Sequence, residues 1–401
     1  EGGEIRIEPA GEDTAIFVFK TVADPFVGKM SLFKVMNGTL RRDMTLRNLT
    51  SGAQEKMAHI YTMRGKKQTE VEELVCGDIG MIPKLSNTQT NDTLRLTGDA
   101  QYRHIIFPTP YLTKAIVPAA KGDEDKISGG IARLLEEDHT LRYENNAETK
   151  QMTISGLGDI HLDVTVARLK SRYGTSVLLE EPRIAYRETI KGTSDVEGKH
   201  KKQSGGSGQY GHVKIRFSHG DEDGLTFVSS VVGGTVPKNF YPAVQKGLEE
   251  AMEHGVLAGY PVVSLKADLY DGSYHPVDSN EISFKLAARL AYKAGLPQAK
   301  PILLEPVGTL LVTVPDAMVG DVIGDLNKRR GRVLGMNPTE GKSGYTTVEA
   351  DVPKAEMADY VIALRQSSQG RGSFEFTVKS YEEVPGAVAQ KIISEHKIEE
   401  E

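Results

Sequence analysis

The middle of the chain reads TKAIVPA (113–119), EDKISGGIARLLEED (124–138), TLRYENN (140–146), QMTISG (151–156), LGDIHLDVTVARLKSRYG (157–174) and TSVLL (175–179). These segments follow one another as strand, helix, strand, strand, helix and strand. That order is the one found in a ferredoxin-like βαββαβ domain. The stretch therefore predicts the fold class of this part of the chain.

The same order of elements returns closer to the C-terminus. It reads GTLLVTVP (308–315), DAMVGDVIGDLNKRRG (316–331), RVLGMN (332–337), GYTTVEADVP (344–353), KAEMADYVIALRQSSQG (354–370) and SFEFTV (373–378). In each stretch a Gly-Asp pair, Gly158-Asp159 or Gly324-Asp325, stands in or beside a helix. We interpret the two stretches as two copies of one architecture, with no claim of common ancestry.

The residues before the first copy show a different pattern, with short alternating strands broken by turns. They read AIFVFKTV (15–22), MSLFKVMNG (30–38), MTLRNL (44–49), AHIYTM (58–63) and DIGMIPK (78–84). This pattern predicts a small closed β-barrel. We expect Asn37-Gly38 to form a hairpin turn, since both residues accept positive φ at low cost.

A less regular segment lies between the two copies. Its expected strands are HVKIRFSH (212–219), LTFVSSVV (225–232) and VVSLKADLYDG (262–272), and its expected helices are YPAVQKGLEEAMEHG (241–255) and EISFKLAARLAYKAG (281–295). Val244, Leu248 and Met252 share one face of the first helix, which we expect to pack on a sheet. The sequence thus predicts a multidomain α+β chain: a β-barrel (1–104), a first ferredoxin-like domain (105–182), a less regular α+β domain (183–300), called the arm domain below, and a second ferredoxin-like domain with a C-terminal tail (301–401).

Length and composition agree with several globular domains. A chain of 401 residues is too long for one core and fits about three or four domains. No run approaches the roughly 18 apolar residues of a membrane span, and residues 1–11 lack the apolar segment of a signal peptide. Cys76 is the only cysteine, so we expect a reducing, cytoplasmic setting and no internal disulfide.

The net charge of −6 argues against nucleic-acid binding over the whole surface, so any RNA contact is expected to be local. One candidate is the basic loop GKHKKQSGGSGQYGH (198–212). Between Lys191 and Arg216, six Lys and Arg residues stand against two carboxylates. Glycines let a backbone approach phosphate closely, and Gln209 can hydrogen-bond to base edges or 2′-hydroxyls. The alternative is a mobile, solvated hairpin without a ligand.

A second candidate is DGSYHPVDSN (271–280), which leads into a helix. Asp278 or Ser279 is expected to cap that helix, and Glu281 adds a favourable charge to its first turn. Pro276 fixes its own φ and so holds His275 at the tip of the loop. The alternative is that this lone histidine is incidental.

A third candidate is the cluster Lys328, Arg329, Arg330 and Arg332 at the expected C-terminus of a helix. Cations there complement the helix dipole, which is the simpler interpretation. Four cations in five residues are more than a helix C-terminus requires, so the more specific interpretation is a patch that faces phosphate groups.

The sequence gives no support for catalysis or metal binding. Asp159, His161 and Asp163 alternate, but residues two apart point to different faces of a helix, so no metal site is predicted. Cys76 has no flanking histidine and no G-x-S-x-G motif is present, so no catalytic residue is predicted. The G-x-x-x-x-G-K-[ST] motif is also missing, and this chain alone is not expected to hydrolyse GTP.

Several strings in this sequence resemble the elongation factor G family of bacterial translation factors. They are GKHKKQSGGSGQYGHV (198–213), GSYHPVDSNEISFKLAA (272–288), AKPILLEPV (299–307) and GDVIGDLNKRRG (320–331). The string EEPRIAYRETI (180–190) resembles the junction between the family's third and fourth domains. The resemblance extends from about residue 13 to residue 396, in the family's order and spacing.

The resemblance implies that the barrel is domain II, the ferredoxin-like domains are III and V, and the arm domain, similar to domain 2 of ribosomal protein S5, is domain IV. It implies a monomer that binds both ribosomal subunits and tRNA–mRNA in the decoding centre, and no membrane. The implied tRNA and mRNA contacts are Gly205, Gly206, Ser207, Gly208, Gln209, Tyr210, Tyr274, His275, Pro276 and Asp278. The implied rRNA contacts are Lys199, Lys201, Lys202, Lys328, Arg329, Arg330 and Arg332.

The family's GTPase domain has no counterpart in this sequence, so GTP and Mg²⁺ are implied for that domain and no cofactor for this chain. Ser207 stands where many members have Arg, and Pro276 where many have Asp, which favours a paralogue. The resemblance implies the ribosome-binding part of a GTP-dependent translocase that moves tRNA and mRNA by one codon. The alternative is a ribosomal protection, rescue or recycling factor of the same GTPase family.

Overall fold

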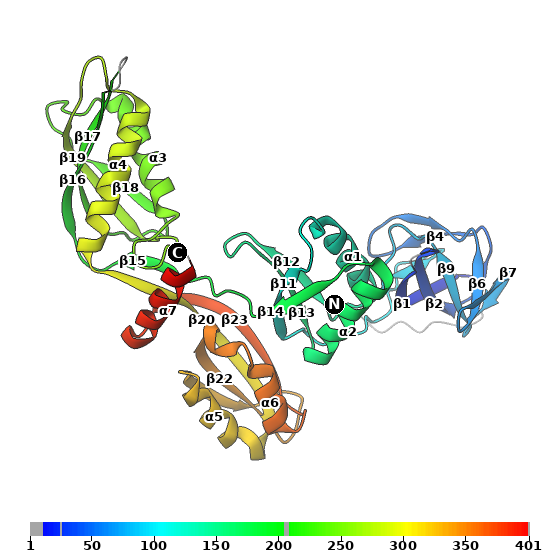
Figure 1. The fold of residues 1–401 in the computed structure, drawn as a ribbon. Coiled ribbons are helices and arrows are strands. Elements are labelled where there is room, and N and C mark those ends of the chain that lie inside the picture. The colour runs from blue at the N-terminus through cyan, green and yellow to red at the C-terminus, as the bar shows by residue number, and fades with distance from the viewer. Residues whose placement is uncertain (1–10, 25, 204–207, 400–401) are drawn as a thin grey trace. The chain divides into compact units, whose positions relative to one another are not determined.

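The computed structural model describes residues 11–24, 26–203 and 208–399, with side chains up to residue 396. Contacts divide the chain into two compact units, residues 1–183 and 184–401. The first contains the barrel strands and the first ferredoxin-like domain, and the second contains the arm domain and the second ferredoxin-like domain (Figure 1).

The N-terminal strands form one large sheet and one small sheet. The large sheet has the order β5-β4-β10-β1-β2-β9-β6-β7, and β3 pairs with β8 separately. The strands are β1 (Ala15–Asp24), β2 (Gly28–Asn37), β3 (Thr39–Arg41), β4 (Thr45–Asn48), β5 (Gln54–Lys56), β6 (Ile60–Arg64), β7 (Lys67–Val71), β8 (Glu73–Val75), β9 (Ile79–Pro83) and β10 (Thr93–Arg95).

Two details of the predicted barrel were wrong. Within the described residues no pairing joins the end strands β5 and β7, so the sheet is a half-barrel and not a closed barrel. The reason is that β3 and β8 pair with each other and leave the path of the large sheet. Asn37 and Gly38 do not form a hairpin turn, because they connect β2 to β3, which belong to different sheets.

The first ferredoxin-like domain has the predicted order of elements. It consists of β11 (Leu112–Pro118), α1 (Glu124–Glu137), β12 (Arg142–Asn146), β13 (Gln151–Gly156), α2 (Asp159–Tyr173) and β14 (Val177–Glu180). The sheet order is β12-β13-β11-β14 with antiparallel neighbours throughout. Helix α1 buries Ile127, Ile131 and Leu134, whose spacing of three and four residues gives one apolar face.

The arm domain is a four-stranded sheet with two helices. The strands are β16 (Ser194–Lys202), β17 (Gln209–His219), β18 (Leu225–Ser229) and β19 (Leu265–Ser273), in the order β16-β17-β19-β18. Helix α4 (Glu281–Gly295) packs on β16 and β17, while α3 (Tyr241–Met252) packs on α4 and β18 (Figure 1). Val244, Leu248 and Met252 are buried, so the predicted apolar face of α3 is confirmed.

Helix α4 lies unusually close to the strands that it covers. A Cβ atom on Gly198 would lie 2.0 Å from the carbonyl oxygen of Ala287, and one on Gly211 would lie 2.3 Å from that of Ser283. Real Cβ atoms do not approach backbone at such distances. Within GKHKKQSGGSGQYGH, the outer glycines Gly198 and Gly211 are therefore required by packing against the helix.

The second ferredoxin-like domain repeats the topology of the first. It consists of β20 (Pro301–Pro315), α5 (Val319–Lys328), β21 (Arg332–Pro338), β22 (Tyr345–Pro353), α6 (Tyr360–Ser368) and β23 (Ser373–Glu383), followed by α7 (Gly386–Glu399). The path β23-β20-β22-β21 matches β14-β11-β13-β12 of the first copy. The prediction of two copies of one architecture is thus confirmed.

Strand β15 (Arg187–Ile190) connects the arm domain to β20 by antiparallel pairing. Its Glu188 is buried, and the carboxylate accepts hydrogen bonds from the backbone N–H groups of Leu257 (2.8 Å), Ala258 (2.8 Å) and Tyr260 (3.2 Å). Burial raises the pKa of Glu188, and these donors act in the opposite direction. The strand and the loop 255–261 are thereby held as one piece.

The close approach of α4 generates the first prediction. Gly198→Ala should lower the stability of the arm domain by about 1–3 kcal/mol, the usual cost of overpacking a close contact. Calorimetric unfolding of the whole chain measures the effect. Gly224→Ala is the matched control, because a Cβ there meets nothing within 4 Å. Equal midpoints of thermal unfolding for the two variants would contradict the conclusion that packing against α4 requires a glycine at position 198.

Candidate nucleic-acid interface

The β16–β17 hairpin carries the first predicted contact segment. Its register places Lys202 opposite Gln209. Lys199, Lys201 and Lys202 therefore lie on β16, and their placement in a loop was wrong. The physical reason is that a strand covered by a helix on one face accepts polar residues on the other, and Lys199 and Lys201 occupy that exposed face.

Three of the predicted contacts, Gly205, Gly206 and Ser207, lie outside the described residues and stay predictions. Gly208 is described, and its backbone N–H donates to the Asp278 carboxylate over 3.1 Å. Gln209 is partly buried, and its side-chain oxygen lies 2.8 Å from His200 Nε2 on the opposite strand. His200 was not among the predicted residues, because its cross-strand position follows only from the register.

The 274–279 loop carries the second predicted segment. Tyr274, His275 and Pro276 are exposed, as expected for a loop tip. The helix cap is Asn280, whose side chain accepts from the N–H of Ser283 over 2.8 Å, so the predicted caps Asp278 and Ser279 were wrong. A residue further along caps α4 because the two predicted caps bond within the loop and to β17.

Tyr210 connects the two segments. Its N–H donates to the carbonyl oxygen of Asp278 over 2.9 Å, and its carbonyl accepts from the Ser279 hydroxyl over 2.8 Å. The Tyr210 ring lies 6.3 Å from the His275 ring, between centroids. Its hydroxyl lies 2.7 Å from that of Ser273 at the end of β19. The structure therefore brings together predicted residues that are far apart in sequence.

The lysines nearest the end of the hairpin have no carboxylate partner among the residues that the structure describes. The Lys199 ammonium lies 5.9 Å from the centre of the Tyr210 ring. Lys201 and Lys202 are exposed on the same strand. Cations without carboxylate partners can neutralise phosphates, so these three side chains fit the predicted rRNA contact.

Farther along the hairpin the cations are paired. Lys214 donates to Asp271 over 2.9 Å, and Arg216 pairs with Asp195 over 3.2 Å. The hydrogen bond from Lys214 lowers the pKa of Asp271 to about 2. The positive charge available to a ligand is thus concentrated toward the end of the hairpin that also holds Gln209.

The arginines of the second predicted rRNA cluster have internal partners. Arg330 forms a bidentate pair with Glu305 (2.5 and 2.9 Å), a carboxylate that is 2% exposed, and also bonds Glu356. The hydrogen bond with Glu305 raises the pKa of Arg330 above its usual value. Arg329 bonds Asp325 over 2.8 Å and Asp359 over 2.6 Å.

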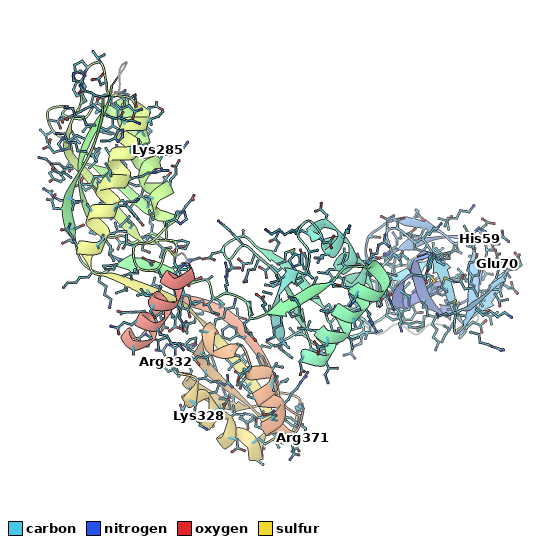
Figure 2. The ribbon with its side chains drawn as sticks, in the orientation of Figure 1. His59, Glu70, Lys285, Lys328, Arg332 and Arg371 are labelled. Carbon is cyan, nitrogen blue, oxygen red and sulfur yellow. The ribbon has the colours of Figure 1, made fainter. Side chains whose placement is uncertain are left out.

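The cluster is therefore less available to phosphate than its sequence suggested. Arg332 also pairs with Asp351 and Glu382, although its side chain is exposed. Lys328 is exposed and has no ion-pair partner within residues 11–24, 26–203 and 208–396. Figure 2 shows Lys328, Arg332 and Arg371 at separate points of the second ferredoxin-like domain. Arg371, which follows α6 (Tyr360–Ser368) and was not among the predicted residues, is also exposed.

Asp159, His161 and Asp163, which alternate in the sequence, do not gather into a metal site in the described part of the chain. Among the described residues, no three His, Cys, Asp or Glu side chains gather to hold a metal ion. His161 instead bonds Asp138 over 2.9 Å and accepts from the Leu157 N–H over 3.0 Å. None of the described helices is long and apolar enough to cross a membrane.

The buried arginine pair generates the second prediction. Arg330→Met should destabilise the second ferredoxin-like domain by about 3–5 kcal/mol, because Glu305 would remain buried without its partner. Lys328→Met, a change at an exposed cation, should cost less than about 0.5 kcal/mol. Urea unfolding of both variants measures the difference. Equal stability of the two would show that Arg330 has no such structural role.

Comparisons with known proteins agree with this arrangement. Four family models match consecutive parts of the chain: Elongation factor G domain 2 (13–97), Elongation Factor G domain III (107–181), Elongation factor G domain IV (182–300) and Elongation factor G C-terminus (302–392). A curated Elongation factor G-like protein from Thermotoga maritima is 44% identical over 403 residues, which cover 100% of this chain and 59% of that protein.

A crystal structure of a protein from Thermus thermophilus has the same fold. Its TM-score is 0.80 at 36% identity, covering 96% of this chain and 58% of that chain. This chain thus spans about three fifths of the length of both proteins. Because the four models follow one another in the family's order over nearly the whole sequence, the chain belongs to the elongation factor G family.

Proposed function

We propose that this chain is the ribosome-binding part of a GTP-dependent translocase, which moves tRNA and mRNA by one codon. Membership of the elongation factor G family supports a role in translation elongation. The observation that carries the finer proposal is the arrangement at the end of the arm domain. Gln209 lies opposite Lys202 on the neighbouring strand. The Tyr210 ring lies 5.9 Å from the Lys199 ammonium and 6.3 Å from the His275 ring, between centroids.

The chemistry of this end suits RNA. Lys199, Lys201 and Lys202 supply charge for phosphates, while Gln209 and His275 supply hydrogen-bonding groups for base edges or 2′-hydroxyls. In the proposed reaction these two side chains hold the codon–anticodon pair as it moves. The contact is local, in keeping with the net charge of −6.

The remaining parts of the proposal concern the whole protein. GTP and Mg²⁺ would be bound by a GTPase domain outside this sequence, and this chain would need no cofactor. Its partners would be both ribosomal subunits and tRNA–mRNA, bound by a monomer in the cytoplasm. Lys328 and Arg371 would be candidate rRNA contacts in the second ferredoxin-like domain, because they are exposed and no carboxylate pairs with them in the described residues. Lys342 and Lys354 share both properties.

The third prediction concerns movement of mRNA. In the full-length protein, Gln209→Ala combined with His275→Ala should slow one-codon displacement at least about tenfold, since each lost hydrogen bond costs about 1 kcal/mol. Ribosome binding should change little. Toeprinting on pre-translocation ribosomes measures displacement. His59→Ala, in the N-terminal strands (Figure 2), is the control, because the His59 side chain is 50% exposed and that of His275 is 51% exposed.

The outcomes separate the candidate functions. Normal displacement of mRNA by the double variant would refute the roles proposed for Gln209 and His275. GTP hydrolysis on the ribosome without displacement by the unaltered protein would instead favour a protection, rescue or recycling factor.

The fourth prediction concerns salt. Lys201→Gln should reduce the slope of log affinity for ribosomes against log salt by about 0.7–0.9, the value for one lost phosphate contact. Lys285→Gln should leave the slope unchanged, because Lys285 is paired with Glu250 on α3 (Figure 2). Filter binding over a range of KCl concentrations measures both. Identical slopes for the two variants would argue against a phosphate contact at Lys201.

A further inference from the structure

The 274–279 loop is fastened to Gly208 and the first residues of β17 by Asp278 and Ser279. The resemblance implied Asp278 as an RNA contact, whereas Ser279 was not among the predicted contacts. Asp278 accepts the Tyr210 N–H with its carbonyl (2.9 Å) and the Gly208 N–H with Oδ1 (3.1 Å). The Ser279 hydroxyl donates to the Tyr210 carbonyl over 2.8 Å. Three hydrogen bonds thus connect segments that are about seventy residues apart.

The Ser279 hydroxyl also holds the loop from within. It accepts the N–H of His275 over 2.8 Å while it donates to Tyr210, and the Ser279 N–H donates to the His275 carbonyl over 3.1 Å. A hydroxyl can donate and accept at once, which this position requires. The bonds therefore transmit the position of β17 to the backbone of His275.

The His275 ring is held in one tautomer by the same loop. Its Nδ1 accepts the backbone N–H of Asp278 over 3.1 Å, faces that of Val277 at 3.4 Å, and lies 3.3 Å from Oδ2 of the Asp278 carboxylate. The carboxylate alone would favour a proton on Nδ1, but the two backbone donors are aimed at this nitrogen. A nitrogen that accepts cannot carry a proton, so the neutral ring carries its proton on Nε2. The side chain is 51% exposed. The loop thus leaves Nε2–H as the donor for an acceptor outside the protein.

We propose that Ser279 and Asp278 are positioning residues that join the two tip segments into one preformed body, and that this body presents His275 to RNA as a hydrogen-bond donor through Nε2. The matching acceptor is a phosphate, 2′-hydroxyl or carbonyl oxygen of RNA. A donor ordered before binding loses less conformational entropy when it binds. The identity of the ligand rests on the proposed function, but the joining of the segments does not.

Hydrogen exchange of the full chain, without ribosomes, tests the joining. Ser279→Ala should accelerate amide exchange about tenfold in both peptides, 208–212 and 274–280. Each peptide loses a hydrogen bond, and a loss of about 1 kcal/mol raises the population of the open, exchanging state by nearly that factor. Ser279→Thr keeps the hydroxyl and should restore slow exchange. Ser229→Ala, at an exposed position of β18, is the control. Acceleration confined to 274–280, or none in either peptide, would overturn the proposal.

Nitrogen NMR of the full chain labelled with ¹⁵N-histidine tests the tautomer. In its neutral form, the His275 ring should show its proton on Nε2. His275→Gln identifies its signals. In Ser279→Ala the two nitrogens should shift toward the averaged values of exchanging tautomers. A proton on Nδ1 in the unaltered chain would overturn the proposal.

Toeprinting separates this inference from the proposed function. If exchange and tautomer behave as stated, Ser279→Ala in the full-length protein should slow one-codon displacement, and Ser279→Thr should restore it. A different outcome is that Ser279→Ala accelerates exchange in both peptides, while neither it nor the Gln209 and His275 double variant slows displacement. That result would support the joining of the two segments and refute their action on RNA.

Discussion

The close contact between helix α4 and strands β16 and β17 is the constraint on which the arm domain depends. Gly198 and Gly211 allow the helix backbone to lie directly on the strands. Because α4 begins at Glu281, directly after the 274–279 loop, this contact also fixes where that loop ends. Asp278 and Ser279 then connect the loop to β17. The position of His275 is thus set by packing first and by hydrogen bonds second.

Charge pairing distinguishes two basic clusters that look alike in the sequence. At the end of the arm domain, Lys199, Lys201 and Lys202 lack carboxylate partners within the described residues, whereas Arg329 and Arg330 are engaged inside the second ferredoxin-like domain. A buried pair such as Arg330 with Glu305 fixes structure, since either charge alone would be costly to bury. Of the two predicted clusters, the one on the arm domain therefore has more cations without a carboxylate partner among the described residues.

The order of elements could be predicted because the strands and helices of each ferredoxin-like domain have clear local patterns of apolar residues. Contacts between distant residues could not. Glu305 lies 25 residues from Arg330, and nothing local indicates that they pair. Asp278 looked like a helix cap because its spacing suits one, yet its carboxylate accepts the N–H of Gly208, which lies in the β16–β17 hairpin. The half-barrel was missed because strand patterns do not reveal which strands at the ends of a sheet pair.

The most direct measurement of the central claim is cleavage of RNA by a hydroxyl-radical probe tethered to the arm domain. Tyr274→Cys in a Cys76→Ser background provides one attachment point within this chain, on an exposed residue, with any cysteine elsewhere in the full-length protein replaced as well. Serine can replace the Cys76 thiol as donor to the Met36 carbonyl. The account predicts cleavage of small-subunit rRNA and tRNA beside the codon–anticodon pair, in post-translocation complexes of the full-length protein. Cleavage confined to other RNA regions, or none, would contradict it.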